Sequence, residues 1–414
     1  MSDPQISNPF RIVYAAGPGD VIATYQHWVK GTDDPAQVAV TYSSQFYDVC
    51  QSLHATGYIL ASHPRTEQLQ AGSFRLEHRP ILWQRSPHIL FHLGQIWYGL
   101  RLVISAVRFQ ATVVIVADGT THWFVLGLLP LLGIRVIPSL HCLLWRTFQP
   151  QRRVEQLLWR LNRTLFRDQV TAILAVSTEI ARQVEQLAGT LQPPVALFLP
   201  IYRREQFADL APSNWGTQDL SQGRSPFRVL FAGRIEPEKG VFDLLEIAKR
   251  LARESQGEIV FDLCGEGTAL DELRQVVRDA GLELVFFCHG HCNQAQMRQH
   301  YAQSHVVIAP TRTDFGEGLN KVVVEGVLAG RPVVTAATCP ALSYVRAAVV
   351  EVLPDDLQGY GDALLKLWSD RTFYQHKQQA CLKLQECFYD PARSWAATLR
   401  TILVALPRQK YPSR

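Results

Sequence analysis

Short apolar runs alternate with segments of helical periodicity along most of this chain. That alternation is typical of parallel β-sheets covered by helices on both faces, so the predicted fold class is α/β. In the amino half we expect strands at residues 11–15, 38–42, 58–61, 112–117, 136–139 and 173–176. A second series of strands is expected near Val229, Ile259, Leu284, Val306 and Val333.

The length of 414 residues exceeds what one hydrophobic core usually organises, so two domains are expected. Residues 208–226 are rich in Ser, Gly, Pro, Asp and Gln and show little periodicity. We therefore place an interdomain linker there, between a first domain at 1–207 and a second at 227–390. The tail at 391–414 should contain a helix, because four apolar residues share one face at helical spacing, namely Trp395, Leu399, Ile402 and Leu403.

The charge balance excludes nucleic acid as an expected partner, because the net charge is only +4 and the chain holds no tract of Lys and Arg. Eight cysteines are scattered behind an amino terminus that lacks the pattern of a signal peptide. This usage favours a cytoplasmic location with reduced thiols. No uninterrupted apolar run reaches the ~18 to 20 residues of a membrane-spanning helix, so no span is expected.

Peripheral contact with the inner face of a membrane is left open by a basic and apolar segment at residues 150–167. Arginines alternate there with leucines and aromatic residues, which suits an anionic lipid surface. The other interpretation is a surface helix whose apolar face packs on its own domain while its arginines are solvated. A second segment of this kind, at 96–109, does not decide between the two.

The most informative segment for function places Glu317 and Glu325 on either side of a turn and a helix start, Gly318-Leu319-Asn320. The first turn of a helix presents backbone N–H groups without intrahelical partners, together with the positive end of the helix dipole, so it suits a phosphate. Carboxylates repel phosphate, so the two glutamates should face a neutral group that donates hydroxyl hydrogens. A sugar nucleotide has both parts.

Two cations precede this segment. The apolar run at 229–231 breaks at Gly233-Arg234, and Lys239 follows five residues after Arg234. Beyond the carboxyl end of a strand, a planar guanidinium and an ammonium suit the oxygens of a diphosphate. Taken alone, both residues are better explained as solvated loop charges. Their occurrence together with the glutamate segment favours the diphosphate.

These motifs resemble, in order and spacing, the carboxyl half of a family-4 glycosyltransferase. The similarity is strong from about residue 228 to 337 and weaker over the amino half. It implies the GT-B architecture: two facing Rossmann-like domains with parallel sheets, and a C-terminal helix that crosses back to the first domain. It also implies a hexosyltransferase-like enzyme that retains anomeric configuration without metal or cofactor, with the nucleotide sugar as co-substrate. The acceptor would be a glycan, a lipid-linked sugar or a small molecule, in polysaccharide or glycolipid biosynthesis.

The resemblance also implies roles for single residues. Glu317 would contact hydroxyls of the transferred sugar and Glu325 the nucleotide ribose, while Arg234 and Lys239 would neutralise the leaving diphosphate. His141 matches a histidine near the reacting sugar, where an imidazole can hydrogen-bond a hydroxyl. A lone histidine is otherwise more often structural. One departure from the family is Gly326, where alanine is common.

Two glycine-rich loops invite a dinucleotide-binding interpretation that fits poorly. After Gly17 and Gly19, the third glycine position holds Ile22, and after Gly265 the matching position holds Leu270. Both loops are better explained as tight turns, either structural or allowing close approach of a ligand. In the resembling family the first loop lies near the donor phosphates and the acceptor.

A run of four metal-binding side chains at residues 288–292 resembles a zinc cluster. Successive side chains at the end of a strand point to opposite faces, so these residues cannot surround one tetrahedral ion, and no metal site is expected. Two other functions remain open: an epimerase or phosphorylase on the same fold, and a non-catalytic nucleotide-sugar-binding or assembly protein.

Overall fold

The computed structural model of the chain describes residues 10–407 except 36, 84, 85, 87, 88, 118, 119, 190–192, 212, 214 and 216–224. It contains two compact units. The first is built from the chain up to Leu144, Gln151–Ile201 and the stretch from Pro391, and the second from Trp145–Pro150 and Tyr202–Asp390.

The predicted linker at 208–226 lies mostly outside the described residues. Trp215, from that segment, belongs to the second unit. Its ring is buried 4.9 Å from the ring of Phe227, and its indole N–H donates to the carbonyl oxygen of Trp368 over 3.2 Å. The chain passes from the first unit to the second after Ile201, earlier than the predicted boundary.

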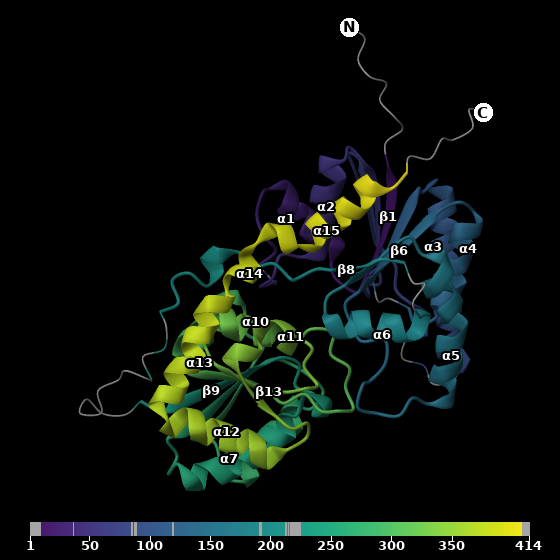
Figure 1. The fold of residues 1–414 in the computed structure, drawn as a ribbon. Helices are drawn as coiled ribbons and strands as arrows, with labels where there is room; N and C mark the ends of the chain where they lie inside the picture. Colours follow the sequence, from purple (N-terminus) through teal and green to yellow (C-terminus); the bar gives the residue numbers. More distant parts are fainter. Residues whose placement is uncertain are drawn as a thin grey trace, which may run out of the picture. The chain divides into compact units, whose positions relative to one another are not determined.

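The first unit contains an eight-stranded sheet in the order β3-β4-β2-β1-β5-β6-β7-β8 (Figure 1). Neighbouring strands are parallel except for the β3–β4 hairpin. The strands are β1 Arg11–Ala16, β2 Thr56–Ala61, β3 Glu67–Ala71, β4 Phe74–His78, β5 Val113–Ala117, β6 Arg135–Leu140, β7 Ile173–Ala175 and β8 Val195–Leu197.

The helices of the first unit are α1 Val21–Val29, α2 Tyr42–Ser52, α3 Ile89–Arg108, α4 Leu128–Leu131, α5 Arg153–Thr164, α6 Thr178–Ala188 and α15 Trp395–Ala405. Hydroxyl or carboxylate side chains cap the amino ends of several of them. Asp20, Thr41, Ser177 and Ser394 each accept a hydrogen bond from a backbone N–H in the first turn, of α1, α2, α6 and α15 respectively.

The terminal helix α15 packs on the first unit, as the architecture predicted from the sequence requires. Trp395, Leu399 and Leu403 are buried. The N–H of Ala396 donates to Gln45 of α2 over 3.0 Å. The amphipathic pattern of the tail therefore reflects packing against the amino-terminal part of the chain.

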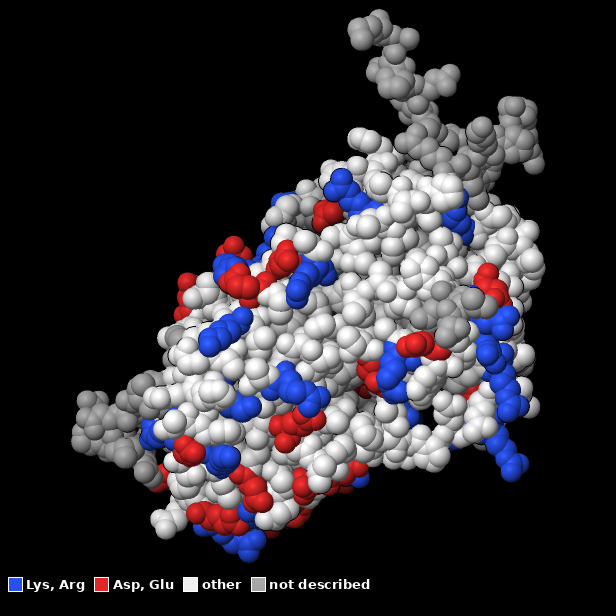
Figure 2. Space-filling view, in the orientation of Figure 1, with Lys and Arg blue, Asp and Glu red and all other residues white. Residues whose placement is uncertain are grey.

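Lys and Arg side chains gather along α5, at the edge of the first unit (Figure 2). Of the residues in α5, Asn162 is the buried one. The rest of the helix is exposed or half-buried, including its apolar residues.

The strand predicted at 38–42 is wrong. The hydroxyl of Thr41 accepts the N–H of Ser44 and starts α2 at Tyr42. The N–H of Val40 donates to Ile201 over 2.9 Å outside any strand. A cap at the start of a helix therefore outweighs the β-branched run before it.

The second unit holds a six-stranded parallel sheet in the order β11-β10-β9-β12-β13-β14. Its strands are β9 Phe227–Ala232, β10 Ile259–Cys264, β11 Phe286–Gly290, β12 Val306–Ala309, β13 Val333–Ala336 and β14 Val349–Val352. Its helices are α7 Val241–Glu254, α8 Leu270–Asp279, α9 Gln294–Gln303, α10 Lys321–Leu328, α11 Leu342–Val345, α12 Leu357–Ser369, α13 Arg371–Leu384 and α14 Glu386–Tyr389.

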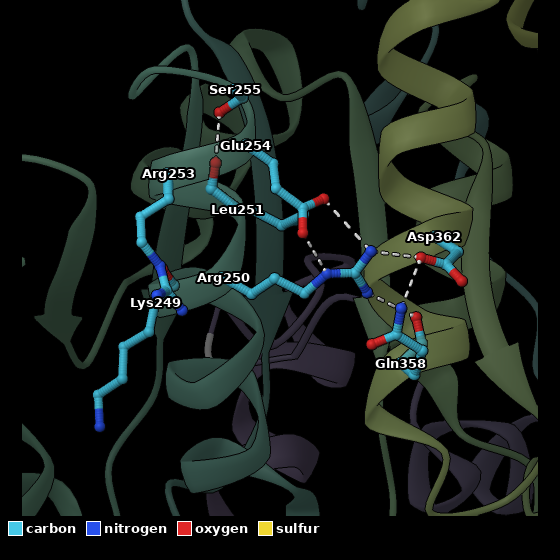
Figure 3. Close-up of polar contacts among 8 residues, drawn as sticks. All are labelled: Lys249, Arg250, Leu251, Arg253, Glu254, Ser255, Gln358 and Asp362. Carbon is cyan, nitrogen blue, oxygen red and sulfur yellow. Dashed lines mark hydrogen bonds and ion pairs between the residues drawn. The ribbon is translucent and has the colours of Figure 1, made fainter.

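Helices α7 and α12 pack beside each other on the core of this unit and are joined at the surface by Arg250 (Figure 3). Its guanidinium donates to Glu254 over 2.7 Å, to Asp362 over 2.5 Å and to the carbonyl oxygen of Gln358 over 3.1 Å. The partners are solvent-exposed, so this brace mainly sets the register of the two helices and adds little stability.

Candidate active site

The strand orders place the predicted residues of each unit at a topological switch point. In the second sheet the chain moves outward from β9 to β11 and then returns to β12 on the other side of β9. In open parallel sheets, ligands bind outside the carboxyl ends of the strands at such a switch. The loop after β9 carries Gly233, Arg234 and Lys239, and the loop after β12 leads to Glu317.

The structure brings Arg234, Lys239 and Glu317 together around Phe315. The ammonium of Lys239 pairs with the carboxylate of Glu317 and lies 4.2 Å from the centre of the Phe315 ring. The guanidinium of Arg234 lies 5.3 Å from the same ring. The side chains of Lys239 and Glu317 are largely buried, so their attraction is weakly screened. Phe315 was not predicted from the sequence.

Glycines allow these loops to approach one another. A Cβ atom built on Gly265 would lie 1.7 Å from the carbonyl oxygen of Gly233, and one on Gly240 would lie 2.2 Å from that of Pro310. The N–H of Gly233 donates to Cys264 over 3.0 Å. The loops after β9, β10 and β12 are therefore in backbone contact, which fixes Arg234 and Lys239 relative to Glu317.

The turn before α10 is also held by its backbone. Asn320, with φ of +69°, is the N-cap of α10. Leu319 is buried, and its carbonyl oxygen accepts the N–H of Ala341 over 3.1 Å. Gly318 precedes it in the same turn. The helix starts at Lys321, so the predicted helix amino terminus is present at this position.

Glu325 lies on α10 and accepts hydrogen bonds from two tyrosines. The hydroxyl of Tyr301 donates over 2.9 Å and that of Tyr202 over 3.4 Å. Burial raises the pKa of the Glu325 carboxyl, and the tyrosine hydrogen bonds and the Lys321 ammonium counteract this only in part. Neither tyrosine was predicted, because both come from segments distant from α10 in the sequence.

The packing of α10 explains glycine at position 326. A Cβ atom there would lie 3.0 Å from side-chain atoms of Val307 and 3.1 Å from Val333, on the neighbouring strands β12 and β13. In this chain the β-branched valines fill the space that a methyl group would take. Gly326 thereby lets α10 lie close to the sheet.

His141 lies in the first unit, directly after β6. Its Nε2 is 2.9 Å from the hydroxyl oxygen of Ser139, which accepts the indole N–H of Trp395 over 2.8 Å. Because Ser139 accepts from Trp395, its own hydrogen is available for Nε2 of His141. The rings of Tyr42 and Phe198 lie 4.4 and 5.3 Å from the imidazole.

Gly17 and Gly19 follow β1, beside the switch point of the first sheet between β1 and β5. A Cβ atom on either residue would meet no atom within 4 Å. Unlike Gly265, these two glycines are not required by contacts within the chain. Asp20 caps α1 after them through the N–H of Ala23, at 2.8 Å.

Within the run at 288–292, Cys292 lies close to possible metal ligands from other elements of the second unit. Ligand atoms of Cys264, Cys292 and His300 all lie within 4.8 Å of one another. Two sulfurs and one imidazole nitrogen suit zinc in type, although a tetrahedral site needs a fourth ligand. Sequence spacing does not predict this group, because Cys264 ends β10, Cys292 follows β11 and His300 lies on α9.

In a second group, Asp262, His289 and His300, the carboxylate of Asp262 already has hydrogen-bond partners. Asp262 accepts from Arg228 and from Nε2 of His289, each over 2.7 Å. Burial acts to raise the pKa of Asp262, but these hydrogen bonds lower it below its ordinary value. The carboxylate is thus compensated without a metal ion.

Comparisons with known proteins agree with this arrangement. Residues 218–381 match the family model described as glycosyl transferases group 1. The chain is 30% identical over 116 residues to the UDP-N-acetylglucosamine–peptide N-acetylglucosaminyltransferase GtfA subunit of Streptococcus pneumoniae, covering 28% of this chain and 22% of that protein. It is 25% identical over 143 residues to a 2-deoxystreptamine N-acetyl-D-glucosaminyltransferase of Niallia circulans, covering 34% and 35%. The matches thus span about a fifth to a third of these curated relatives.

Several solved structures resemble the whole chain in fold. Anabaena Alr3699/HepE, in complex with UDP, superposes with a TM-score of 0.65 at 16% identity, covering 95% of this chain and 98% of that one. WaaG, a glycosyltransferase involved in lipopolysaccharide biosynthesis, gives 0.67 at 12% identity, covering 95% and 100%. The predicted fold class is confirmed, and residues 218–381 match glycosyl transferases group 1, the group to which the predicted resemblance points.

Proposed function

We propose that this chain, whose residues 218–381 match glycosyl transferases group 1, transfers a sugar from a nucleotide-sugar donor to an acceptor. The observation that carries the proposal is the grouping of Arg234 and Lys239 with Glu317 around Phe315, beside the switch point of the second sheet. It supplies cations for a diphosphate next to a carboxylate for sugar hydroxyls. Neither an epimerase nor a phosphorylase is favoured by a specific observation.

The contact between Lys239 and Glu317 suggests how the donor would bind. Without donor, the ammonium is balanced by the carboxylate. A diphosphate carries more negative charge than Glu317, so it would draw Lys239 towards itself. The carboxylate oxygens of Glu317 would then accept hydrogen bonds from hydroxyls of the sugar. Donor binding would thus replace one charge pair with a stronger one.

The reaction breaks the bond between the anomeric carbon and a donor phosphate oxygen and forms a bond from that carbon to the acceptor oxygen. Negative charge develops on the leaving diphosphate, where Arg234, Lys239 and the start of α10 stabilise it. We propose that the acceptor proton passes to the departing phosphate on the same face of the sugar. The configuration is then retained, and neither a protein nucleophile nor a metal ion is needed.

The remaining residues are assigned to binding. We propose that Glu325, oriented by Tyr301 and Tyr202, accepts hydrogen bonds from the nucleotide ribose. His141, held by Ser139, is proposed to hydrogen-bond a sugar hydroxyl or the reaction centre. The open space above Gly17 and Gly19 supports close approach of donor phosphates or acceptor.

Donor binding is tested by thermal unfolding of purified protein against a panel of nucleotide sugars. A ligand at 100 times its Kd stabilises the folded state by about 2.7 kcal/mol. We expect one donor to raise the Tm of the wild type and of Lys249→Ala, which removes a half-buried lysine on α7 that pairs with Glu246. Lys239→Ala should lose most of that increase. Equal increases in all three proteins would remove Lys239 from the proposed site.

Transfer is separated from binding by the release of nucleoside diphosphate. A transferase releases it only when an acceptor is supplied, whereas a non-catalytic binding protein releases none. We propose a cytoplasmic location and a lipid-linked acceptor at the inner face of a membrane, because the basic helix α5 is almost wholly exposed. If a glycan or a small molecule proved to be the effective acceptor, the proposed lipid-linked acceptor would be contradicted, but the proposed sugar transfer would not.

A further inference from the structure

Large hydrophobic side chains are exposed in one part of the first unit. More than half of those exposed among the described residues lie on α3, on α4 with the following Leu132, and on α5. The most exposed include Ile89 at 72%, Leu131 at 77% and Leu157 at 55%. Single exposed hydrophobic residues are ordinary, but such a concentration on one side of a domain marks an interaction surface.

Helix α3 has the clearest pattern. Its buried side carries Gly94, Gly99, Leu102 and Ala106 among other residues, and packs on the domain. Its outward side carries Ile89, Leu93, Trp97 and Ile104, spaced so that they form one stripe. A helix at the surface of a domain normally turns polar residues outward. This helix has an apolar face on each side, and the domain covers only one of them.

Helices α3 and α5 are anchored to the same short segment. The N–H of Thr121 donates to Gln95 of α3 over 3.4 Å, and the carbonyl oxygen of Thr121 accepts from Asn162 of α5 over 3.0 Å. The N–H of Phe124 also donates to Asn162, over 3.0 Å. The two helices, with α4 between them in the sequence, therefore lie along one edge of the first unit (Figure 1).

The charge on these helices is almost wholly positive. Arg101 and Arg108 are the charged residues of α3, and α4 has none. On α5, Arg153, Arg160 and Arg163 are exposed, and no ion pair to them occurs within the described part of the chain. Two acidic residues lie on α5 or just after it, and both already have partners. Glu155 accepts the backbone N–H of Arg152, and Asp168 pairs with Arg167.

We propose that this α3–α5 face, the exposed side chains of α3, α4, Leu132 and α5, binds the surface of an anionic lipid bilayer. Apolar side chains flanked by arginines match a membrane interface, where they enter the acyl boundary while the guanidinium groups meet phosphate headgroups. A second copy of this chain fits less well, because a symmetric dimer would oppose like-charged arginines. The acidic surface that the arginines require is supplied by lipid.

The membrane contact deepens the proposed function by naming where the acceptor is found. A lipid-linked acceptor would reach the enzyme only from the membrane plane, so attachment raises its local concentration. This consequence rests on the proposed sugar transfer. The binding of lipid by the α3–α5 face does not, since it follows from the exposure and charge of these helices.

Co-sedimentation of the full-length protein with vesicles tests the proposal. One set of vesicles is phosphatidylcholine alone, and the other contains added phosphatidylglycerol. Two variants probe the two contributions: Arg160→Gln with Arg163→Gln, and Leu93→Gln with Trp97→Gln. The control is Arg278→Gln with Leu284→Gln, which removes an exposed arginine and an exposed leucine from the second unit. The rise in Tm with nucleotide sugar is measured for each protein.

We expect binding to the anionic vesicles and little to the neutral ones. Each arginine near an anionic surface contributes about 1 kcal/mol, so the double arginine variant should bind at least tenfold more weakly, as should the apolar variant. The control should bind like the wild type. Absence of binding, or equal binding by all variants, overturns the proposal, as does a dimer in solution that these variants dissociate. If no nucleotide sugar raises the Tm of the wild type although that protein binds the anionic vesicles, the proposed sugar transfer is contradicted. The proposed binding of lipid by the α3–α5 face is then unaffected.

Discussion

The close approach of two loops at Gly240 gives a sharp test of the candidate site. Gly240 precedes α7 with φ of +75°, and a Cβ atom there would lie 2.2 Å from the carbonyl oxygen of Pro310. Gly281, in the same unit, has φ of +64°, but a Cβ atom would meet no atom within 4 Å. Gly240→Ala and Gly281→Ala therefore share the backbone strain, and only the first adds a collision.

The expected magnitudes follow from these two effects. A left-handed conformation costs a non-glycine residue about 1–2 kcal/mol, which applies to both variants. Overpacking against a fixed backbone adds about 1–3 kcal/mol at Gly240. Domains of this size lose roughly 2–4 °C of Tm per kcal/mol, so Gly240→Ala should melt about 2–12 °C below Gly281→Ala.

Differential scanning calorimetry measures the Tm of each variant, and the rise in Tm on addition of the donor reports how well the site binds that donor. Relief of the collision requires the loop after β12 to move away from the residue next to Lys239. Gly240→Ala should therefore also weaken donor binding, whereas Gly281→Ala should not. Equal Tm values for the two alanine variants, with unchanged donor binding, would refute the argument that backbone contact between these loops builds the site.

Three further predictions concern other parts of the chain. Burial lowers the pKa of His305 from its ordinary value of 6.5 to about 4. As the pH falls from 6.5 to about 4, this histidine therefore takes up a proton in the unfolded chain but not in the folded chain. The free energy of unfolding should fall by about 2 kcal/mol from this residue between pH 7 and pH 5, and His305→Asn should flatten the urea-measured profile; parallel profiles would contradict this. Ser139→Ala leaves the buried N–H of Trp395 without its acceptor, so we expect the free energy of unfolding to fall by about 1–3 kcal/mol. We also expect a lower kcat, because Ser139 holds His141, with an unchanged donor-dependent rise in Tm. An unchanged kcat would exclude a role for Ser139 in holding His141. Activity should survive EDTA and Cys292→Ser, and its loss in either case would show that the thiol and imidazole group serves catalysis through a metal ion.

The candidate site was predictable where chain order determines position. Parallel strands end at a common edge, so the residues after β9 and β12 must lie near each other once both runs are recognised as neighbouring strands. This explains why Arg234, Lys239 and Glu317 could be grouped in advance. The sequence does not specify which of these side chains pair directly, and the contact of Lys239 with Glu317 emerges only from the fold.

The residues that orient the site were missed for a different reason. Ser139 and Trp395 are in direct contact although 256 positions separate them in the sequence. Tyr301 reaches Glu325 from another helix. Such contacts depend on how helices and strands pack against one another. The sequence around a serine or tyrosine does not indicate that its hydroxyl will hold another side chain, so these contacts become evident only in the folded structure.

Hydropathy leaves the role of α3 undecided for a physical reason. Ile89–Arg108 is long and apolar enough to cross a membrane by length and composition, and the described part of the chain contains one such helix. Interruptions such as Gln95 and Arg101 concealed it from a search for unbroken apolar runs. A core helix, a membrane span and a helix lying on a bilayer can share this composition, because hydropathy sums over all sides of the helix. The fold separates them: small residues such as Gly94 and Gly99 seat one side on the domain, and the apolar residues that remain are turned outward. A helix so seated cannot cross a bilayer without leaving the domain, whereas it can lie on one without any change in the fold.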